Sequence, residues 1–187
     1  MKVFRIRLNS NKYQSFLPVD DKVWQSELLT MDCQEKQQDW TAPSVYIDNP
    51  KLIKGNFFDF CSGAFVVDSI AHDVLQEVLE WAGEILPLPH KDELFHLVNV
   101  RECVNCLDEL NTKWVIGKTT GAKIRIEQYE FLANRFSEST LFKIPETAKG
   151  EMLTVTGIKD PEDEFKTIVE RAGLTGIIFE ELWSDEK

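Results

Sequence analysis

Apolar and polar residues alternate in short stretches along much of the chain, and each such stretch predicts a β-strand. The first, KVFRIRL, places Phe4, Ile6 and Leu8 on one face and two arginines on the other, as in a half-buried strand. LFHLVNV, at 94–100, is apolar on both faces, which is typical of a central strand. Other short apolar stretches predict strands at residues 64–68, 84–88, 140–145, 152–156 and 175–182.

A β-hairpin is predicted in the middle of the chain. KWVIG and AKIRIEQYEF both have the composition of strands, and they flank the polar tetrapeptide KTTG. Gly121 supplies the turn, because glycine adopts the positive φ that tight turns require.

Two stretches carry apolar residues at the spacing of an α-helix. In SIAHDVLQEVLEWAG, Asp68 or Ser69 is expected to cap the first turn and Gly83 to end the helix. In DPEDEFKTIVERAG, Asp160 is the expected cap and Pro161 takes the first helical position. The expected apolar stripes are Ile70, Val74, Leu75, Val78, Leu79 and Ala82 in the first helix, and Phe165, Ile168, Val169 and Ala172 in the second.

Each predicted helix ends in Ala-Gly and lies between two predicted strands, which gives two strand–helix–strand units. They are either a true duplication or a common α/β unit that occurs twice. The expected class is α+β (or α/β), with a mixed, largely antiparallel sheet and two main helices. We expect one domain over 1–187, with an irregular N-terminal part at 1–55, where prolines interrupt the few short strands, and a core at 56–183.

The charge balance narrows the range of partners. The formal net charge is −11, which disfavours nucleic acid and anionic membranes because both select basic surfaces. Basic residues interrupt the apolar runs at the start, and no run reaches the roughly 20 apolar residues of a membrane helix. We therefore expect a cytoplasmic protein whose four cysteines are reduced thiols.

The CVNC segment at Cys103 to Cys106 has the spacing of a zinc or redox motif. A structural zinc site needs four ligands, and Cys33 and Cys61 lie far away in the sequence. A redox pair is expected before a helix that lowers the thiol pKa, and LDELNTKW is too short and interrupted for one. The two cysteines are therefore interpreted as packing residues, and no metal or cofactor is expected.

Other candidate chemistry is sparse. His72 and Asp73 share the first turn of a helix, but adjacent helical residues point in different directions, so no dyad is expected. GKTTGAK lacks the spacing of a phosphate-binding loop and is followed by a strand. Two alternatives stay open: an enzyme whose site is assembled from scattered residues, and a small-molecule or self-associating module that uses exposed aromatics. The residues concerned are His72, His96, Asp108 and Glu180 for the enzyme, and Trp40 and Trp183 for the module.

Four stretches carry a family resemblance: FFDFCSGAFVVDSIAHDVLQ, LFHLVNVRECVNCLDEL, LFKIP, and MLTVT with AGLTGIIFEELW. Their order and spacing, from about Asn56 to Trp183, resemble the formerly uncharacterised bacterial domains that are grouped as immunity proteins of polymorphic toxin systems (family eleven type). The resemblance implies a protein that binds and neutralises a cognate toxin by stoichiometric contact, without cofactor or nucleophile. In the family pattern Asn99 and Asp108 recur, whereas the cysteine pair does not. Asp108 is interpreted as a turn residue, as are Gly121, Gly173 and Gly176.

Acidic residues gather in DPEDE and in FEELWSDEK. They form a solvated surface, a surface that meets a basic partner, or a site for metal or acid–base chemistry. For an immunity protein we expect the second role, with a basic toxin such as a nuclease as partner; the oligomeric state is open. The partner-binding residues expected from charge are Asp160, Glu162, Asp163, Glu164, Glu180, Glu181 and Asp185.

Overall fold

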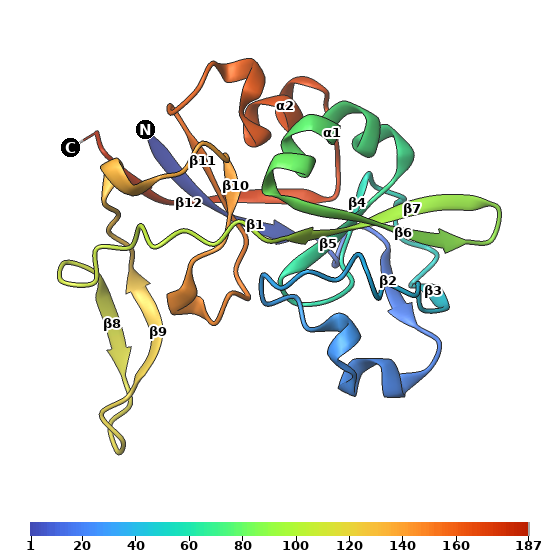
Figure 1. The fold of residues 1–187 in the computed structure, drawn as a ribbon, viewed down its shortest axis with the longest axis horizontal. Coiled ribbons are helices and arrows are strands. Elements are labelled where there is room, and N and C mark those ends of the chain that lie inside the picture. Colours follow the sequence, from blue (N-terminus) through green and yellow to red (C-terminus); the bar gives the residue numbers. More distant parts are fainter. Residues whose placement is uncertain (187) are drawn as a thin grey trace.

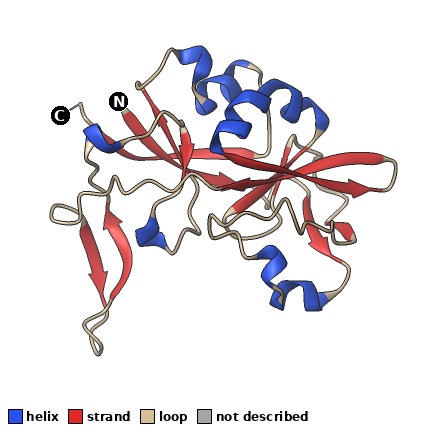
Figure 2. Cartoon of the chain, viewed as in Figure 1, coloured by secondary structure: helices blue, strands red, loops and turns tan. Residues whose placement is uncertain are grey.

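Two four-stranded antiparallel sheets lie side by side, with both helices on one side of them and irregular segments on the other (Figure 1, Figure 2). This arrangement is seen in a computed structural model, which describes residues 1–186. The prediction of an α+β fold with largely antiparallel pairing and two main helices is confirmed.

The first sheet has the order β10-β11-β1-β12, and all neighbouring strands are antiparallel. Its strands are β1 (Lys2–Leu8), β10 (Leu141–Phe142), β11 (Leu153–Thr156) and β12 (Ile177–Ser184). The second sheet has the order β4-β5-β7-β6, also antiparallel throughout. Its strands are β4 (Phe57–Phe58), β5 (Ala64–Val67), β6 (Gly83–His90) and β7 (Glu93–Val100).

The two predicted strand–helix–strand units are confirmed, and they share one strand order. Helix α1 (Ser69–Ala82) connects β5 to β6, which flank the central strand β7. Helix α2 (Phe165–Arg171) connects β11 to β12, which flank the central strand β1. The units differ in the source of the central strand, because β7 follows β6 directly while β1 comes from the opposite end of the chain.

Helix α1 begins and ends where the sequence predicts. The Asp68 carboxylate accepts the backbone N–H of Ala71 at 2.8 Å, and β6 starts at Gly83. The predicted stripe is wrong at two positions, since Ile70 and Val74 are 60% and 43% exposed. The buried face is Ala71, Leu75, Leu79 and Ala82. Two adjacent rows of the helix are apolar, and periodicity alone cannot tell which row faces the sheet.

Helix α2 begins later than predicted. Residues Pro161–Asp163 form a separate 3-10 turn (η5), and the Asp160 side chain caps nothing. The first N–H of the helix, on Phe165, is instead donated to the Thr140 hydroxyl at 3.0 Å. Ala172, expected in the buried stripe, is exposed, because the helix has already ended at Arg171.

Three apolar clusters hold these layers together. The first lies between the helices and both sheets and includes Leu75, Leu79, Phe65 and Phe165. The second packs the N-terminal segment against the other face of the β4-β5-β7-β6 sheet. That segment contains only β2 (Ser15–Pro18), β3 (Val45–Asp48) and the 3-10 turns η1 (Asp21–Gln25) and η2 (Glu27–Leu29). The third cluster packs residues between Val104 and Phe136 against the other face of the first sheet.

The predicted hairpin is confirmed as β8 (Lys113–Ile116) and β9 (Lys123–Gln128), and it projects away from the sheets in Figure 1. Its turn includes Gly121 at φ +69°. Two further 3-10 turns, η3 (Ala133–Arg135) and η4 (Pro145–Thr147), follow. Within residues 1–186, no helix has the length and apolar character needed to cross a membrane.

Candidate partner-binding groove

An open groove of about 1250 Å³ lies between the β8–β9 hairpin and the first sheet. Its walls come from β1, β12, the hairpin and residues 146–151, and residues 59–64 contribute a further wall. The face of β1 explains its position: Val3 points into an apolar cluster, whereas Arg5 and Arg7, two and four residues later on the same face, line the groove. We call this feature the hairpin groove.

A half-buried polar network forms the centre of the hairpin groove. Arg5 donates to the Tyr129 hydroxyl at 2.7 Å and pairs with Glu151 at 3.2 Å, and the Tyr129 hydroxyl donates to Glu151 at 2.6 Å. Burial and the Glu151 carboxylate raise the pKa of Tyr129 to about 12. Burial acts to lower the pKa of Arg5, but Glu151 and Tyr129 outweigh it, so this pKa is raised. At neutral pH the Tyr129 hydroxyl therefore stays protonated and Arg5 stays charged.

Glu180 extends this network along the sheet. Its carboxylate pairs with Arg7 at 2.7 Å and with Arg5 at 3.3 Å, while neighbouring Glu181 pairs with Lys2 at 3.1 Å. On the opposite wall, Lys123 pairs with Glu109 at 2.8 Å and lies 4.5 Å from the centre of the Trp114 ring.

Three buried polar atoms of groove-lining residues have no hydrogen-bond partner within residues 1–186. They are Arg5 Nε, Trp114 Nε1 and Glu146 Oε2. Burial also raises the pKa of Glu146. Buried polar groups are normally paired, so these three atoms are exceptions in the structure.

Carboxylates outnumber cations around the hairpin groove by seven to four. The surface is therefore acidic even after its internal ion pairs are formed. The carboxylates are Asp59, Glu109, Glu127, Glu146, Glu151, Glu180 and Glu181, and the cations are Arg5, Arg7, Lys123 and Arg125.

The acidic residues expected to bind a partner do not form one surface. Glu180 and Glu181 line the hairpin groove, whereas Asp160, Glu162 and Asp163 are exposed before α2. Glu164 is only 3% exposed, so its placement on a binding surface is wrong. Its carboxylate accepts the backbone N–H groups of residues 157–159, which satisfies a buried turn. Asp185 pairs with the N-terminal ammonium at 2.7 Å.

The predicted turn residues lie in turns. The Asp108 carboxylate accepts the N–H groups of Leu110 at 3.2 Å and Asn111 at 3.3 Å, and the Asn111 amide at 2.7 Å. These bonds lower the pKa of Asp108, and the hydrogen bond from the Asn111 side chain has the largest effect. Gly173 ends α2 at φ +65°, and Gly176 has φ +103° where a Cβ would overlap the carbonyl of Phe57.

The expectation that His72 and Asp73 do not contact each other is wrong. The His72 Nδ1 lies 3.0 Å from the Asp73 carboxylate, at the exposed start of α1. The His72 ring also stacks on His96 of β7, with ring centres 4.1 Å apart. Burial, and then the His72 charge, lower the pKa of His96.

The scattered residues of the alternative enzyme site are not brought together. His72 and His96 contact each other, but Asp108 bonds within its own turn and Glu180 bonds to Arg5 and Arg7. The self-association alternative expected Trp40 and Trp183 to be exposed, but both are partly buried. The indole N–H groups of Trp40 and Trp183 donate to the Pro87 carbonyl and the Glu130 carboxylate, and both rings pack against apolar clusters.

Cys33 was expected to lie far from the CVNC segment because the two are distant in the sequence, and this expectation is wrong. Cys33 lies beside Cys103, and both belong to a cluster around Lys143. Cys106 is fully buried and packs in the third apolar cluster, as expected of a packing residue. No group of three or more histidine, cysteine or acidic side chains within residues 1–186 is arranged to hold a metal ion.

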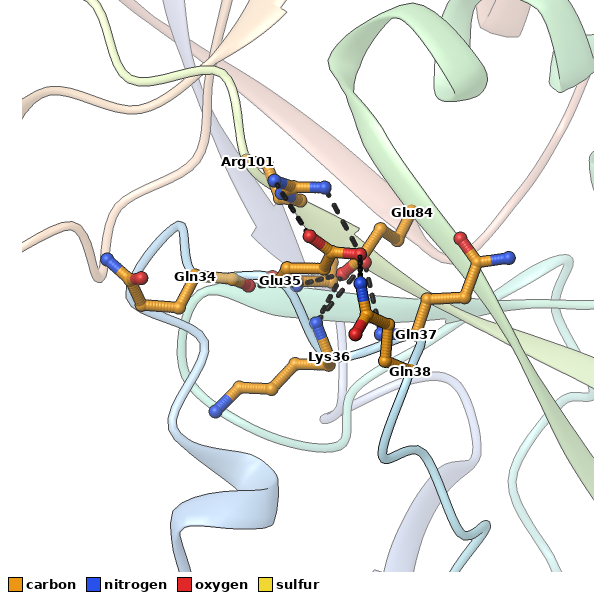
Figure 3. A network of polar contacts seen from close by, with 8 residues as sticks. Gln34, Glu35, Lys36, Gln37, Gln38, Glu84 and Arg101 are labelled. Carbon is orange, nitrogen blue, oxygen red and sulfur yellow. Dashed lines mark hydrogen bonds and ion pairs between the residues drawn. The ribbon is translucent and has the colours of Figure 1, made fainter.

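A second polar network anchors the segment 31–38 to the β4-β5-β7-β6 sheet (Figure 3). Buried Glu84 accepts the backbone N–H groups of Lys36 and Gln37 at 3.0 and 3.1 Å, and the Asn99 amide at 2.8 Å. Asn99 also donates to the Gln34 carbonyl at 3.0 Å. Asn99 therefore has a structural role, which is to hold this segment on the sheet.

No family model matches the chain, and no curated protein matches it.

Sequence reasoning missed most of the hairpin groove. Arg5, Tyr129 and Glu151 lie 22 to 146 positions apart, and no local pattern links them. The one signal available was the pair of arginines on the polar face of the first strand, since carboxylates on neighbouring strands stabilise such charges.

Proposed function

We propose that this protein is an immunity-type binding protein, which neutralises a cognate bacterial toxin by stoichiometric contact, and that the hairpin groove receives a basic segment of that toxin. The observation that carries the proposal is the excess of carboxylates around the groove. A basic partner would be attracted by the acidic field on approach.

The rim of the hairpin groove also offers apolar contact area. Ile124 on the hairpin is 65% exposed and Ile116 is 49% exposed, while Leu110 just before the hairpin is 95% exposed. Exposed apolar residues that are surrounded by charged ones are typical of protein-binding surfaces. The family resemblance of residues 56–183 points to the same class of function.

Co-expression tests this proposal. The chain is produced together with the product of the adjacent upstream gene, and co-purification and growth are measured. Under the proposal the two proteins form a stable one-to-one complex and growth is restored. A neighbouring gene product that is toxic but neither binds nor is neutralised would contradict the immunity function.

A matched pair of charge reversals tests the location. Glu127→Lys lies in the hairpin groove, and Glu162→Lys changes the charge equally on the exposed turn before α2. We expect Glu127→Lys to weaken binding at least about tenfold, because like charges facing each other at an interface are costly, and Glu162→Lys to have little effect. The reverse result would place the partner over α2.

A further inference from the structure

Three chain segments, 31–33, 61–63 and 102–104, converge on Lys143, which follows β10 and is 0% exposed. Its ammonium donates to the carbonyl oxygen of Met31 at 2.6 Å. Its backbone bonds on both sides to the CVNC region, with the N–H donated to Glu102 and the carbonyl accepting Val104, each at 2.8 Å. Gly63 closes the cluster, since a Cβ at that position would lie 3.1 Å from the ammonium.

Three thiols surround this ammonium, those of Cys33, Cys61 and Cys103. Burial lowers the pKa of Lys143, and the nearby cysteines only partly offset that effect. An ammonium has three donors, and the one hydrogen bond that this ammonium makes within residues 1–186 is to the Met31 carbonyl. The Asp32 side chain is a further neighbour. The cluster is therefore an unusual environment for a buried cation, and the chain has brought its cysteines there from distant positions.

Cys33 and Cys103 are direct neighbours within this cluster. Their thiols are close enough to influence each other, and Cys103 is exposed while Cys33 is half-buried. Cys103 forms a β-bridge with Lys143, whose ammonium bonds to Met31, two residues before Cys33. Cys33 has φ +72°, a left-handed conformation that residues with a side chain rarely adopt. Its position is thus imposed by the surrounding contacts, which is common where a residue has a role beyond packing.

The segment that carries Cys33 bridges both sheets. Met31 is bonded to Lys143 at the end of β10, while Gln34, Lys36 and Gln37 are held by Asn99 and Glu84 of the other sheet (Figure 3). Polar contacts alone hold residues 34–38, and most of these residues are exposed. A covalent link at Cys33 would add a fixed point between the two anchors.

We propose that Cys33 and Cys103 are a redox pair whose reversible disulfide fastens the segment 31–38 to residues 102–104. With oxidised glutathione as oxidant, the exposed Cys103 thiolate attacks one glutathione sulfur and releases one reduced glutathione. The Cys33 thiol then loses its proton and attacks the Cys103 sulfur of the mixed disulfide, which releases the second reduced glutathione. Two thiols are oxidised and one disulfide is reduced, and each departing thiolate takes up one of the two protons.

The other two cysteines are excluded from this exchange by burial. Burial raises the pKa of Cys61 and of Cys106 to about 12, and neither thiol is accessible to a bulky oxidant. Burial also raises the pKa of Cys33 to about 11, so the closing step is slow at neutral pH and accelerates as the pH rises.

Peptide mapping tests the pair. The purified full-length protein is equilibrated with defined ratios of reduced and oxidised glutathione, free thiols are blocked, and a non-reducing tryptic digest is analysed by mass spectrometry. We expect one cross-linked species that joins the peptides containing Cys33 and Cys103, and fragmentation assigns the link to Cys103 and not to Cys106. Separate peptides, with glutathione attached to Cys103 alone, would overturn the proposal.

Serine variants provide the controls. Cys33→Ser and Cys103→Ser should each abolish the cross-link, whereas Cys106→Ala should retain it. Oxidation should raise Tm by about 5 °C or more in the parent protein, because the link closes a long loop in the unfolded chain, and should not do so in Cys103→Ser. A cross-link that persists in Cys103→Ser, or an equal Tm shift in both proteins, would refute the assignment.

Discussion

The two strand–helix–strand units have the same strand order but obtain their central strand in different ways. In the first unit, β7 follows β6 through the turn at Lys91 and Asp92, so Gly83 pairs with Val100. In the second unit, β1 pairs with β12 across almost the whole chain, as in the pairing of Leu8 with Ile177. The same geometry is therefore local in one unit and non-local in the other.

The two units thus have the same topology, but the entropy lost in closing the chain to form them differs. Closing the β6–β7 hairpin orders only a few residues and so loses little conformational entropy. Pairing β1 with β12 restricts the whole intervening chain, and this entropy is lost before stabilising contacts form. The first unit also has the helix with more local stabilisation. Helix α1 has 14 residues and a side-chain cap, whereas α2 has 7 residues and no side-chain cap. We therefore expect the first unit to form before the second.

The largest predicted effects concern two fully buried phenylalanines, Phe65 in β5 and Phe165 in α2. Replacing either with Ala should lower the free energy of unfolding by about 3–5 kcal/mol, because the cavity left behind closes only in part. Phe65→Ala should mainly slow folding, and Phe165→Ala should mainly accelerate unfolding. Stopped-flow kinetics in urea measure both rates.

The kinetic prediction has a simple control. Val19→Ala changes a residue that is 63% exposed, and its free energy of unfolding should stay within about 0.5 kcal/mol of the parent value. If Phe165→Ala slowed folding as strongly as Phe65→Ala, both units would form together and the proposed order would be wrong.

Each unit also contains one buried glutamate, and the two carboxylates accept hydrogen bonds from different parts of the chain. Glu164 accepts N–H groups of its own unit, at residues 157–159, whereas Glu84 accepts those of Lys36 and Gln37 in the N-terminal segment. Replacing either with Gln should cost about 1–3 kcal/mol, because charge-assisted hydrogen bonds to the backbone are lost.

Hydrogen exchange distinguishes the two glutamate variants. Glu84→Gln should speed exchange at Lys36 and Gln37 and leave residues 157–159 protected, and Glu164→Gln should do the opposite. Uniformly faster exchange in either variant would mean that its carboxylate supports the whole fold and not one segment.

A smaller difference in stability is expected between variants at the starts of the two helices. Asp68→Ala removes the hydrogen bond to the Ala71 N–H and should destabilise the protein by about 1 kcal/mol. Asp160→Ala, the matching change before α2, should cost less than about 0.5 kcal/mol, because that side chain caps nothing. Urea midpoints measure both, and equal losses would contradict the assignment of the caps.

The smallest predicted effect is a pH dependence confined to the first unit. The folded protein lowers the pKa of His96, so the unfolded chain binds a proton more readily. Stability from this residue is fully present above about pH 6.5, the ordinary histidine pKa, and decreases as the pH falls below it. In His96→Gln the free energy of unfolding should fall less steeply between pH 7 and pH 5; parallel curves would exclude this cause.

The fold was predictable where the signal is local. The Asp68 cap, the end of the helix at Gly83 and the Gly121 turn were each read from a few adjacent residues, and the structure contains all three. The choice of buried face on α1 was not predictable, since Ile70 and Ala71 begin two equally apolar rows and only the sheet decides between them.

The site was less predictable because its contacts are non-local. Arg5 meets Tyr129 across 124 positions, and Met31 meets Lys143 across 112. Glu164 was misjudged for a related reason: an acidic run next to a helix predicts a solvated surface, and only the folded turn at 157–159 makes one of those carboxylates a buried acceptor.

The ion pair between the Met1 ammonium and Asp185 has a practical consequence for protein engineering. An N-terminal affinity tag would convert this ammonium into an amide and remove the charge, so N-terminal fusions alter the edge of the first sheet. Because Met1 and Asp185 are adjacent, circular permutation is also feasible. A flexible linker between them, with new ends opened at Lys91 and Asp92, would make the β1–β12 pairing local and the β6–β7 pairing non-local, and so exchange the roles of the two units.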